Sequence, residues 1–233
     1  MATRALTWLL LSAVLLTCGT AYRRRPDSSK REGCSGGGGD AETLRNVEEK
    51  VTALWRSLLH PDPRGEPLRA ACAMEPNRAQ AADSQIPVRG VVLFHQKSVL
   101  EPLEMALRLE GFPRERRLHG IHVHAHGEIA PGCEAAGPHF NPHEAHHGSH
   151  PGDFGNFQPD AQGRVQQLLP RLQATLYGPD SIVGRSIVVH EGEDDLGHGE
   201  DEGSRLHGNS GKRIACCVIG MASGATWEQH SRP

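Results

Sequence analysis

Apolar residues come in short runs from residue 86 onward, and glycine, proline and aspartate separate these runs. Several runs alternate apolar and polar positions, which is the pattern of a strand with one buried face. The run at 103–112 is also compatible with a helix, but the alternation of Met105, Leu107 and Leu109 favours a strand. We therefore predict an all-β sandwich or barrel. Its strands are expected within 86–96, 103–112, 119–127, 164–178, 181–192 and 212–222.

Two stretches between the predicted strands, 128–163 and 191–211, are long and rich in histidine, aspartate and glycine. Long loops in a compact β domain are often functional, because most connections in such domains are short. The sequence therefore directs attention to these two loops as the place for a functional site.

The N-terminal part of the chain has a different pattern. Residues 41–60 place apolar side chains on one stripe at helical spacing, which predicts an amphipathic helix. The stripe needs a partner, either in its own domain or in the same helix of another copy, and its heptad-like spacing slightly favours association. Residues 22–40 are basic and then glycine-rich, as in a flexible tail. We expect 61–85 to be a linker and 223–233 a C-terminal tail.

The first 21 residues, "MATRALTWLLLSAVLLTCGTA", contain a basic Arg4, an apolar run and small residues near the end. This order is typical of a secretory signal peptide, and the run is too short to cross a bilayer as a helix. No later stretch is long and apolar enough to do so. The mature protein is therefore expected in the extracellular space, without a membrane anchor.

Composition and cysteines refine this picture. A chain of 233 residues with 37% hydrophobic residues allows one ordinary domain plus extensions, and a net charge of −3 argues against nucleic acid as the main partner. After loss of Cys18 with the leader an odd number of cysteines remains. In an oxidising compartment they should pair and leave one over. They are Cys34, Cys72, Cys133, Cys216 and Cys217.

Histidines concentrate in "GIHVHAHGEIAPGCEAAGPHFNPHEAHHGSHPGD", residues 120–153. By itself such a cluster is a solvated loop, a loose metal-binding segment or an ordered metal centre. His122 and His124 share one face if they lie on a strand, while Ile121 and Val123 then point into the core. The nitrogen and carboxylate groups that follow suit four-coordinate zinc. They are His139, His146, His147, His150 and Asp153, and His190 lies far away at the end of an apolar run.

Five segments of the chain resemble, in order, the signature segments of the copper/zinc superoxide dismutase family. They are "GIHVHAHG", "GCEAAGPHFNP", "HPGDFGN", "VVHEGEDDLG" and "GNSGKRIACCVIG". The resemblance covers residues 86–222 and implies an eight-stranded Greek-key β-barrel or sandwich with two long functional loops. The leader, the N-terminal helix and the adjacent cysteines are similar to those of secreted members of the family.

The resemblance also implies a site for two metals, copper and zinc. The implied copper ligands are His122, His124, His139 and His190. The implied zinc ligands are His139, His147, His150 and Asp153, so that His139 bridges both ions. Asp194 is implied to hold one copper and one zinc histidine through their other ring nitrogens, and such bonds fix ring orientation. Arg213 is implied to stand beside copper, where its permanent charge attracts superoxide.

The implied activity is dismutation of superoxide to oxygen and hydrogen peroxide by one-electron cycling of copper, which zinc cannot perform. On reduction His139 is expected to leave copper and take up a proton, while zinc holds His139 and its loop in place. Two other hypotheses are a catalytically silent copper/zinc-binding module on the same barrel and a zinc hydrolase. The hydrolase leaves His190 and Arg213 without a role.

The resemblance implies a disulfide between Cys133 and Cys216. Cys217 faces the opposite side of the same strand, so it needs another partner, for which we choose Cys72. Cys34 then remains to link chains.

A homo-oligomer is expected through the barrel, the N-terminal helix or both. His126, however, stands where family members usually carry an aromatic residue near the dimer contact. Secreted members are associated with a basic C-terminal tail that binds heparin-like polysaccharide, whereas this chain ends in "WEQHSRP". The C-terminus therefore gives no reason to expect polyanion binding. The basic cluster of the chain is Arg23–Arg25 with Lys30 and Arg31, and polyanion binding by this cluster is a hypothesis.

Overall fold

The computed structural model describes residues 37–59, 66–80, 86–115 and 117–230. The chain divides at Glu48 into two units, which are described separately. The part of the second unit that follows helix α2 (Gly37–Leu59) is built from antiparallel strands, and its helical segments are short. The strands are β1 (Leu68–Pro76), β2 (Arg89–Gln96), β3 (Leu103–Glu110), β4 (His119–His124), β5 (Asp153–Phe157), β6 (Arg164–Leu172), β7 (Ser186–His190), β8 (Arg213–Val218) and β9 (Gly220–Met221). The helical segments are the 3₁₀ helix η1 (Cys133–Ala136), α3 (Glu202–His207) and α4 (Gly224–His230).

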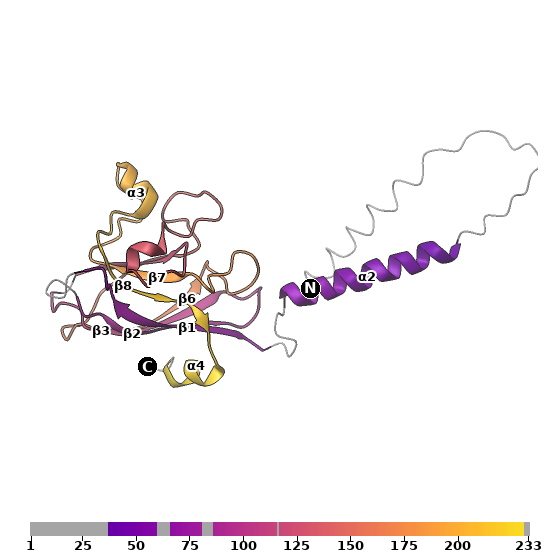
Figure 1. Ribbon diagram of the computed structural model, residues 1–233, viewed down its shortest axis with the longest axis horizontal. Coiled ribbons are helices and arrows are strands. Elements are labelled where there is room, and N and C mark those ends of the chain that lie inside the picture. The colour runs from indigo at the N-terminus through magenta and orange to yellow at the C-terminus, as the bar shows by residue number, and fades with distance from the viewer. Residues whose placement is uncertain (1–36, 60–65, 81–85, 116, 231–233) are drawn as a thin grey trace, which may run out of the picture. The chain divides into compact units, whose positions relative to one another are not determined.

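The eight longer strands follow the order β5-β4-β7-β8-β1-β2-β3-β6, and β9 pairs with β1. Two of the pairs, β3 with β6 and β4 with β7, join strands that are distant in sequence, as Greek-key connections require. Figure 1 shows the strands curled into a barrel, with α3 on one side and α4 on the opposite side. The fold is therefore the nearly closed eight-stranded antiparallel barrel that the sequence predicted.

The core is aliphatic, as the low aromatic content requires, and comes from the alternate residues of each strand. The run at 103–112 is a strand: Leu103, Met105 and Leu107 are fully buried. The largest fully buried apolar side chains of the described chain include Leu93, Phe94, Ile121, Ile182, Ile187, Ile214 and Ile219.

The structure differs from expectation in the range predicted to be a linker, 61–85. Residues 68–76 form β1, which pairs with β2 from Leu68 opposite Gln96 to Met74 opposite Gly90. Its inward-facing residues are Leu68, Ala70, Cys72 and Met74. This alternation has the period of a strand, but alanine is a weak strand former, so the pattern is easily missed. The barrel therefore begins before residue 86.

The predicted C-terminal tail also differs, because residues 224–230 form helix α4. The Trp227 ring stacks on the imidazole of His95 in β2, with 5.0 Å between ring centroids. One aromatic contact thus fixes a segment whose composition looks like that of a tail.

The N-terminal helix α2 spans Gly37–Leu59, so it begins inside the predicted tail. The four apolar side chains of its stripe with described exposure, Leu44, Val47, Val51 and Leu54, are between 46% and 66% exposed. No helix of the described chain is both long and apolar enough to cross a membrane. The predicted signal peptide and most of the predicted tail lie outside the described residues.

Candidate metal centre

Strand β4 carries the first two histidines on the face turned away from the core. Ile121 and Val123 point into the barrel and are 1% exposed, while His122 and His124 lie on the opposite face. The two long loops cover that face, so both imidazoles are buried as well. The period of a strand alone sets this arrangement.

The first long loop brings His139 to the same place. The main chain of His139 forms an isolated antiparallel β-bridge with that of His124. The Phe140 main-chain amide donates to the Val123 carbonyl at 2.9 Å. His190 ends β7, the strand that pairs with β4. Four buried imidazoles from three segments therefore converge on one point, with their ligand atoms within 4.8 Å of one another. They are His122, His124, His139 and His190.

A second group shares His139 with the first. It consists of His139, His147, His150 and Asp153, again with all ligand atoms within 4.8 Å of one another. The Nδ1 atoms of its three histidines lie 3.1–3.3 Å from oxygens of the Asp153 carboxylate. His146, the alternative to His147, is exposed, whereas His147 is buried. Three nitrogens and one carboxylate thus face a common centre.

The buried nitrogen atoms provide a test of whether these groups fit metal ions. In the described chain, several buried ring nitrogens have no hydrogen-bond partner, and such atoms are costly unless something satisfies them. Those in the two groups are His122 Nδ1, His124 Nε2, His139 Nε2, His190 Nε2 and His147 Nδ1, the last of which lies 3.1 Å from Asp153 Oδ2 without hydrogen-bond geometry. Each points to the centre of its group. Two metal ions, one per group, would satisfy all five atoms.

Both ring nitrogens of His139 are used in this arrangement. Its Nδ1 lies 3.3 Å from Asp153, in the second group, while its Nε2 has no partner and faces the first group. One imidazole therefore can contact two ions.

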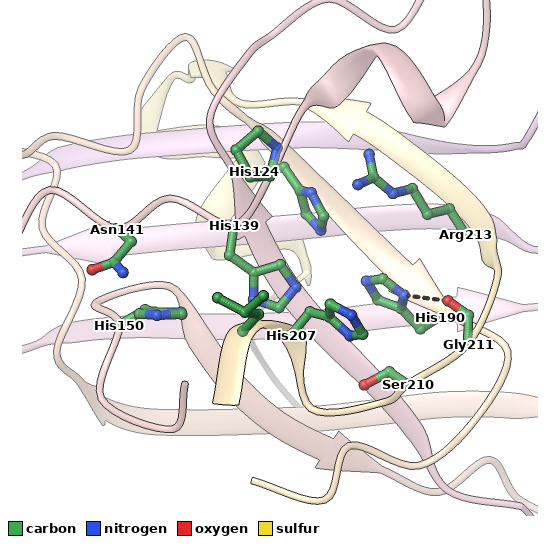
Figure 2. Close-up of a pocket in the computed structure, with 11 residues that line it drawn as sticks. His124, His139, Asn141, His150, His190, His207, Ser210, Gly211 and Arg213 are labelled. Carbon is green, nitrogen blue, oxygen red and sulfur yellow. Dashed lines mark hydrogen bonds between the residues drawn. The ribbon is translucent and has the colours of Figure 1, made fainter. Parts of the chain in front are cut away.

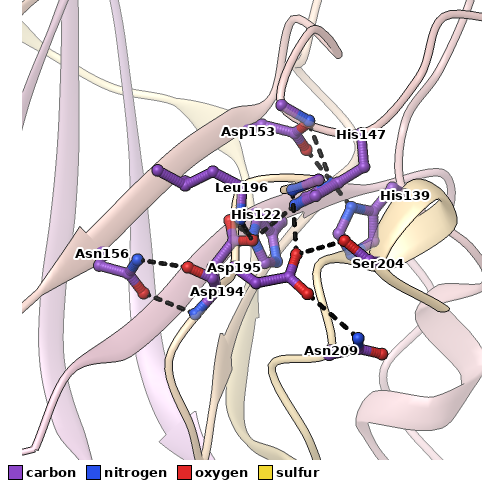
Figure 3. A network of polar contacts seen from close by, with 12 residues as sticks. His122, His139, His147, Asp153, Asn156, Asp194, Asp195, Leu196, Ser204 and Asn209 are labelled. Atoms are coloured by element: carbon purple, nitrogen blue, oxygen red, sulfur yellow. Dashed lines mark hydrogen bonds and ion pairs between the residues drawn. The ribbon is translucent and has the colours of Figure 1, made fainter. Parts of the chain in front are cut away.

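Asp194 links the two groups from behind (Figure 3). Its carboxylate accepts hydrogen bonds from His122 Nε2 at 2.9 Å and from His147 Nε2 at 2.7 Å, and the residue is 1% exposed. Burial alone raises the pKa of this carboxyl, but the two histidines outweigh burial and lower it below its usual range. The carboxylate thus fixes one ring of each group in the orientation that leaves Nδ1 for a metal.

Two residues that the sequence analysis missed hold Asp194. The side-chain amide of Asn156 donates to the Asp194 carbonyl at 2.7 Å, and its oxygen accepts from the Asp194 amide at 2.8 Å. Gly208 has a positive φ of 68°, and a Cβ atom there would lie 1.9 Å from Asp194 Oδ1. Only glycine therefore allows the second loop to close over the carboxylate. The motif "GNSG" contained this signal.

The pKa values of the histidines in the two groups are shifted in opposite directions. Burial lowers the pKa of His190 to about 3 and that of His139 to about 4, so both rings are neutral and can act as ligands. Burial lowers the pKa of His147, but the neighbouring carboxylates of Asp153 and Asp194 outweigh burial and raise it to about 9. The carboxylates favour positive charge at the second group, and a metal cation has that charge.

A pocket of about 590 Å³ leads to the four-histidine group. Figure 2 shows His124, His139, His190 and Arg213 lining it, together with His207 from α3. The Arg213 guanidinium donates to the Cys133 carbonyl at 2.8 Å and to the Gly137 carbonyl at 2.7 Å. These bonds hold a half-buried positive charge at the wall of the pocket. The pocket therefore offers a small anion both a charge and a route to the histidines.

Comparison with known proteins agrees with this geometry. The family described as "Copper/zinc superoxide dismutase (SODC)" matches residues 88–219. The extracellular Cu-Zn superoxide dismutase of Homo sapiens is 41% identical over 226 residues, 96% of this chain and 92% of that protein. That of Oryctolagus cuniculus is 42% identical over 202 residues, 84% of this chain and 82% of that protein.

The chain belongs to the copper/zinc superoxide dismutase family. This membership confirms the barrel, the enzyme class and copper and zinc as the cofactors that the sequence predicted. A superoxide dismutase of Neurospora crassa is 43% identical over 142 residues, 58% of this chain and 91% of that protein. That match leaves more than a third of this chain outside the region shared with that relative.

The structure of this superoxide dismutase joins both cysteine pairs that were expected. Cys133 on η1 is bonded to Cys216, and Cys72 on β1 is bonded to Cys217. The adjacent cysteines of β8 thus face opposite sides of the strand, one toward the loop and one into the barrel. The disulfide between Cys133 and Cys216 anchors the loop to β8, and carbonyl groups of this loop hold the Arg213 guanidinium. Cys34 lies outside the described residues.

Proposed function

We propose that the four-histidine group binds copper and that the group with Asp153 binds zinc. Support comes from the donor sets. A site made only of imidazoles suits copper, whereas three nitrogens with one carboxylate suit tetrahedral zinc. The shared ring of His139 carries the proposal, because its two nitrogens serve one group each.

Copper held by the four-histidine group would supply a centre that takes up and gives back one electron. One superoxide anion gives up an electron and leaves as dioxygen, and a second accepts that electron with two protons and leaves as hydrogen peroxide. His139 would hold a proton at Nε2 when that atom carries no metal, because the second group would still hold its Nδ1. Since His139 lines the pocket, the proton then lies where the second anion arrives.

Arg213 is proposed to bind and guide the superoxide anion. Its guanidinium remains charged because arginine does not lose its proton in proteins, even though burial lowers its pKa. Carbonyl oxygens of Cys133 and Gly137 fix its position at the pocket wall. A fixed cation beside the entrance raises the local concentration of a small anion.

Replacing Arg213 with alanine tests this role. We expect kcat/KM for superoxide to fall about 10-fold or more, with weaker dependence on ionic strength, because the guiding charge is lost. Copper and zinc contents, measured by mass spectrometry, should remain unchanged. Arg114→Ala removes the same charge from an exposed site outside the pocket and serves as the control. Equal rates for both variants would contradict the role of Arg213.

We also propose that the chain is secreted, with residues 1–21 removed. The two most extensive matches described above are extracellular proteins by name, and the predicted leader has the required pattern. After expression in animal cells, the active protein should accumulate in the medium with its N-terminus near Tyr22. Retention of the whole chain inside the cells would contradict secretion. The basic segment between residues 22 and 33 remains a prediction for polyanion binding, testable on a heparin column.

The stripe of α2 is proposed to associate with the same helix of other copies. Leu44, Val47, Val51 and Leu54 are exposed in the single chain, and helices commonly bury such a stripe against one another. The variant Leu44→Ser/Val51→Ser should shift the sedimentation coefficient to a smaller oligomer, whereas Glu49→Ser on α2 should not. A smaller oligomer that is still dimeric would assign the remaining contact to the barrel. An unchanged mass would exclude the helix.

A further inference from the structure

The turn after β1 contains a fully buried polar side chain, that of Asn77, which is 0% exposed. Its amide nitrogen donates to the Arg213 carbonyl at 2.8 Å and to Glu134 Oε1 at 2.9 Å. Its oxygen accepts from the amides of Cys133 at 3.0 Å and Ala79 at 3.1 Å. An asparagine in a turn normally bonds only to its own neighbours, and here three of the four partners are distant in sequence.

These partners belong to the machinery that surrounds the anion. The guanidinium of Arg213 binds the Cys133 carbonyl, while Asn77 binds the Cys133 amide and the Arg213 carbonyl. One side chain therefore joins the main chain of the arginine to the main chain of the loop that holds its charged end. A shift of Asn77 would therefore move both the main chain of Arg213 and the residue whose carbonyl holds its guanidinium.

Two neighbouring hydrogen bonds reinforce the connection that Asn77 makes between Arg213 and the loop of Cys133. Gln80, from the same turn, donates a second hydrogen bond to the Arg213 carbonyl at 3.0 Å. The main-chain N–H of Asn77 donates to the Ile214 carbonyl at 2.9 Å, which fixes the turn to the start of β8. The loop also packs closely, since a Cβ atom on Gly132 would lie 2.5 Å from Ala79 Cβ.

We propose that Asn77 is a positioning residue for Arg213 and that Gln80 assists it. Through them, the turn after β1 sets the affinity of the pocket for small anions. Both residues lie outside the range 88–219 that matches the family, so the segment before the matched domain takes part in substrate binding. The inference rests on the proposed role of Arg213.

The experiment uses the enzyme loaded with copper and zinc and the monoanion azide, followed through the copper absorption spectrum. Because one buried hydrogen bond contributes a factor of about 5 in an equilibrium constant, Asn77→Ala and Gln80→Ala should each weaken azide binding about 5-fold. Arg78→Ala, in the same turn but exposed and paired with Glu75, is the matched control and should bind azide as the wild type does.

A double-mutant cycle separates positioning from general damage to the fold. In the Arg213→Ala background, Asn77→Ala and Gln80→Ala should no longer change azide affinity, because the group through which they act is absent. If both single variants match Arg78→Ala, or if their effects persist without Arg213, the proposal is overturned. Gln80 is only half-buried, so Gln80→Ala decides the question if Asn77→Ala does not fold. If Arg213→Ala itself leaves azide binding unchanged, the failure belongs to the proposed role of Arg213.

Discussion

Replacement of His190 with alanine should remove superoxide dismutation almost completely, while zinc remains bound. His190 belongs only to the four-histidine group, and its Nε2 is one of the buried nitrogens without a partner. Loss of an outer partner of a metal ligand already costs about 10- to 100-fold in metal affinity or activity, so loss of a ligand should cost at least about 100-fold. Activity is measured by superoxide consumption after pulse radiolysis, and metals by mass spectrometry.

The control for this variant is His198→Ala, which removes an exposed histidine from the second long loop. It should keep full activity and both metals. Undiminished dismutation by His190→Ala would refute the copper assignment. Loss of zinc together with copper, in a folded protein, would refute the division of the ligands into two groups.

The second large effect is expected from Asp194→Asn. The carboxylate accepts hydrogen bonds from both His122 and His147, whereas an asparagine side chain has one accepting oxygen and presents N–H groups to the other ring. One ring in each metal group would lose its orientation. Affinities for copper and for zinc should therefore both fall about 10- to 100-fold, as measured by competition with chelators.

The adjacent carboxylate provides a close control. Asp195 accepts hydrogen bonds from Ser204 and Asn209 and contacts no ligand ring, so Asp195→Asn should change loop stability more than metal affinity. A weakening of zinc alone in Asp194→Asn would show that the carboxylate does not connect the two groups. Equal metal affinities for the two variants would remove Asp194 from the metal centre.

Part of the metal centre followed from local geometry. The spacing of His122 and His124 predicted a common face, since alternate residues of a strand point the same way, and the structure places them so. The joining of His190 to this pair did not follow from spacing, because strands distant in sequence meet only through the topology of the sheet. There the resemblance to the family supplied the information.

The errors concern residues whose chemistry is weak or ambiguous in isolation. The inward-facing positions of β1 are leucine, alanine, cysteine and methionine. Other alanines lie between them, so the alternation of apolar and polar residues is weak. Asn156 and Asn77 each bind main-chain groups of distant segments, and no periodicity marks such contacts. The bounds of α2 differ from the prediction as element ends commonly do. Helix α4 was missed because the contact of Trp227 with His95 is not visible in the sequence.

The two disulfides have a consequence for limited proteolysis. One closes a ring between Cys72 and Cys217, and the other closes a ring between Cys133 and Cys216 inside it. A protease that cuts once anywhere between Cys72 and Cys216 leaves two fragments tied together until a reductant is added. A cut between α2 and β1 lies outside both rings, so neither of these disulfides joins the two fragments. A single cleavage there would leave every side chain of the two proposed ligand groups on the fragment that carries the barrel.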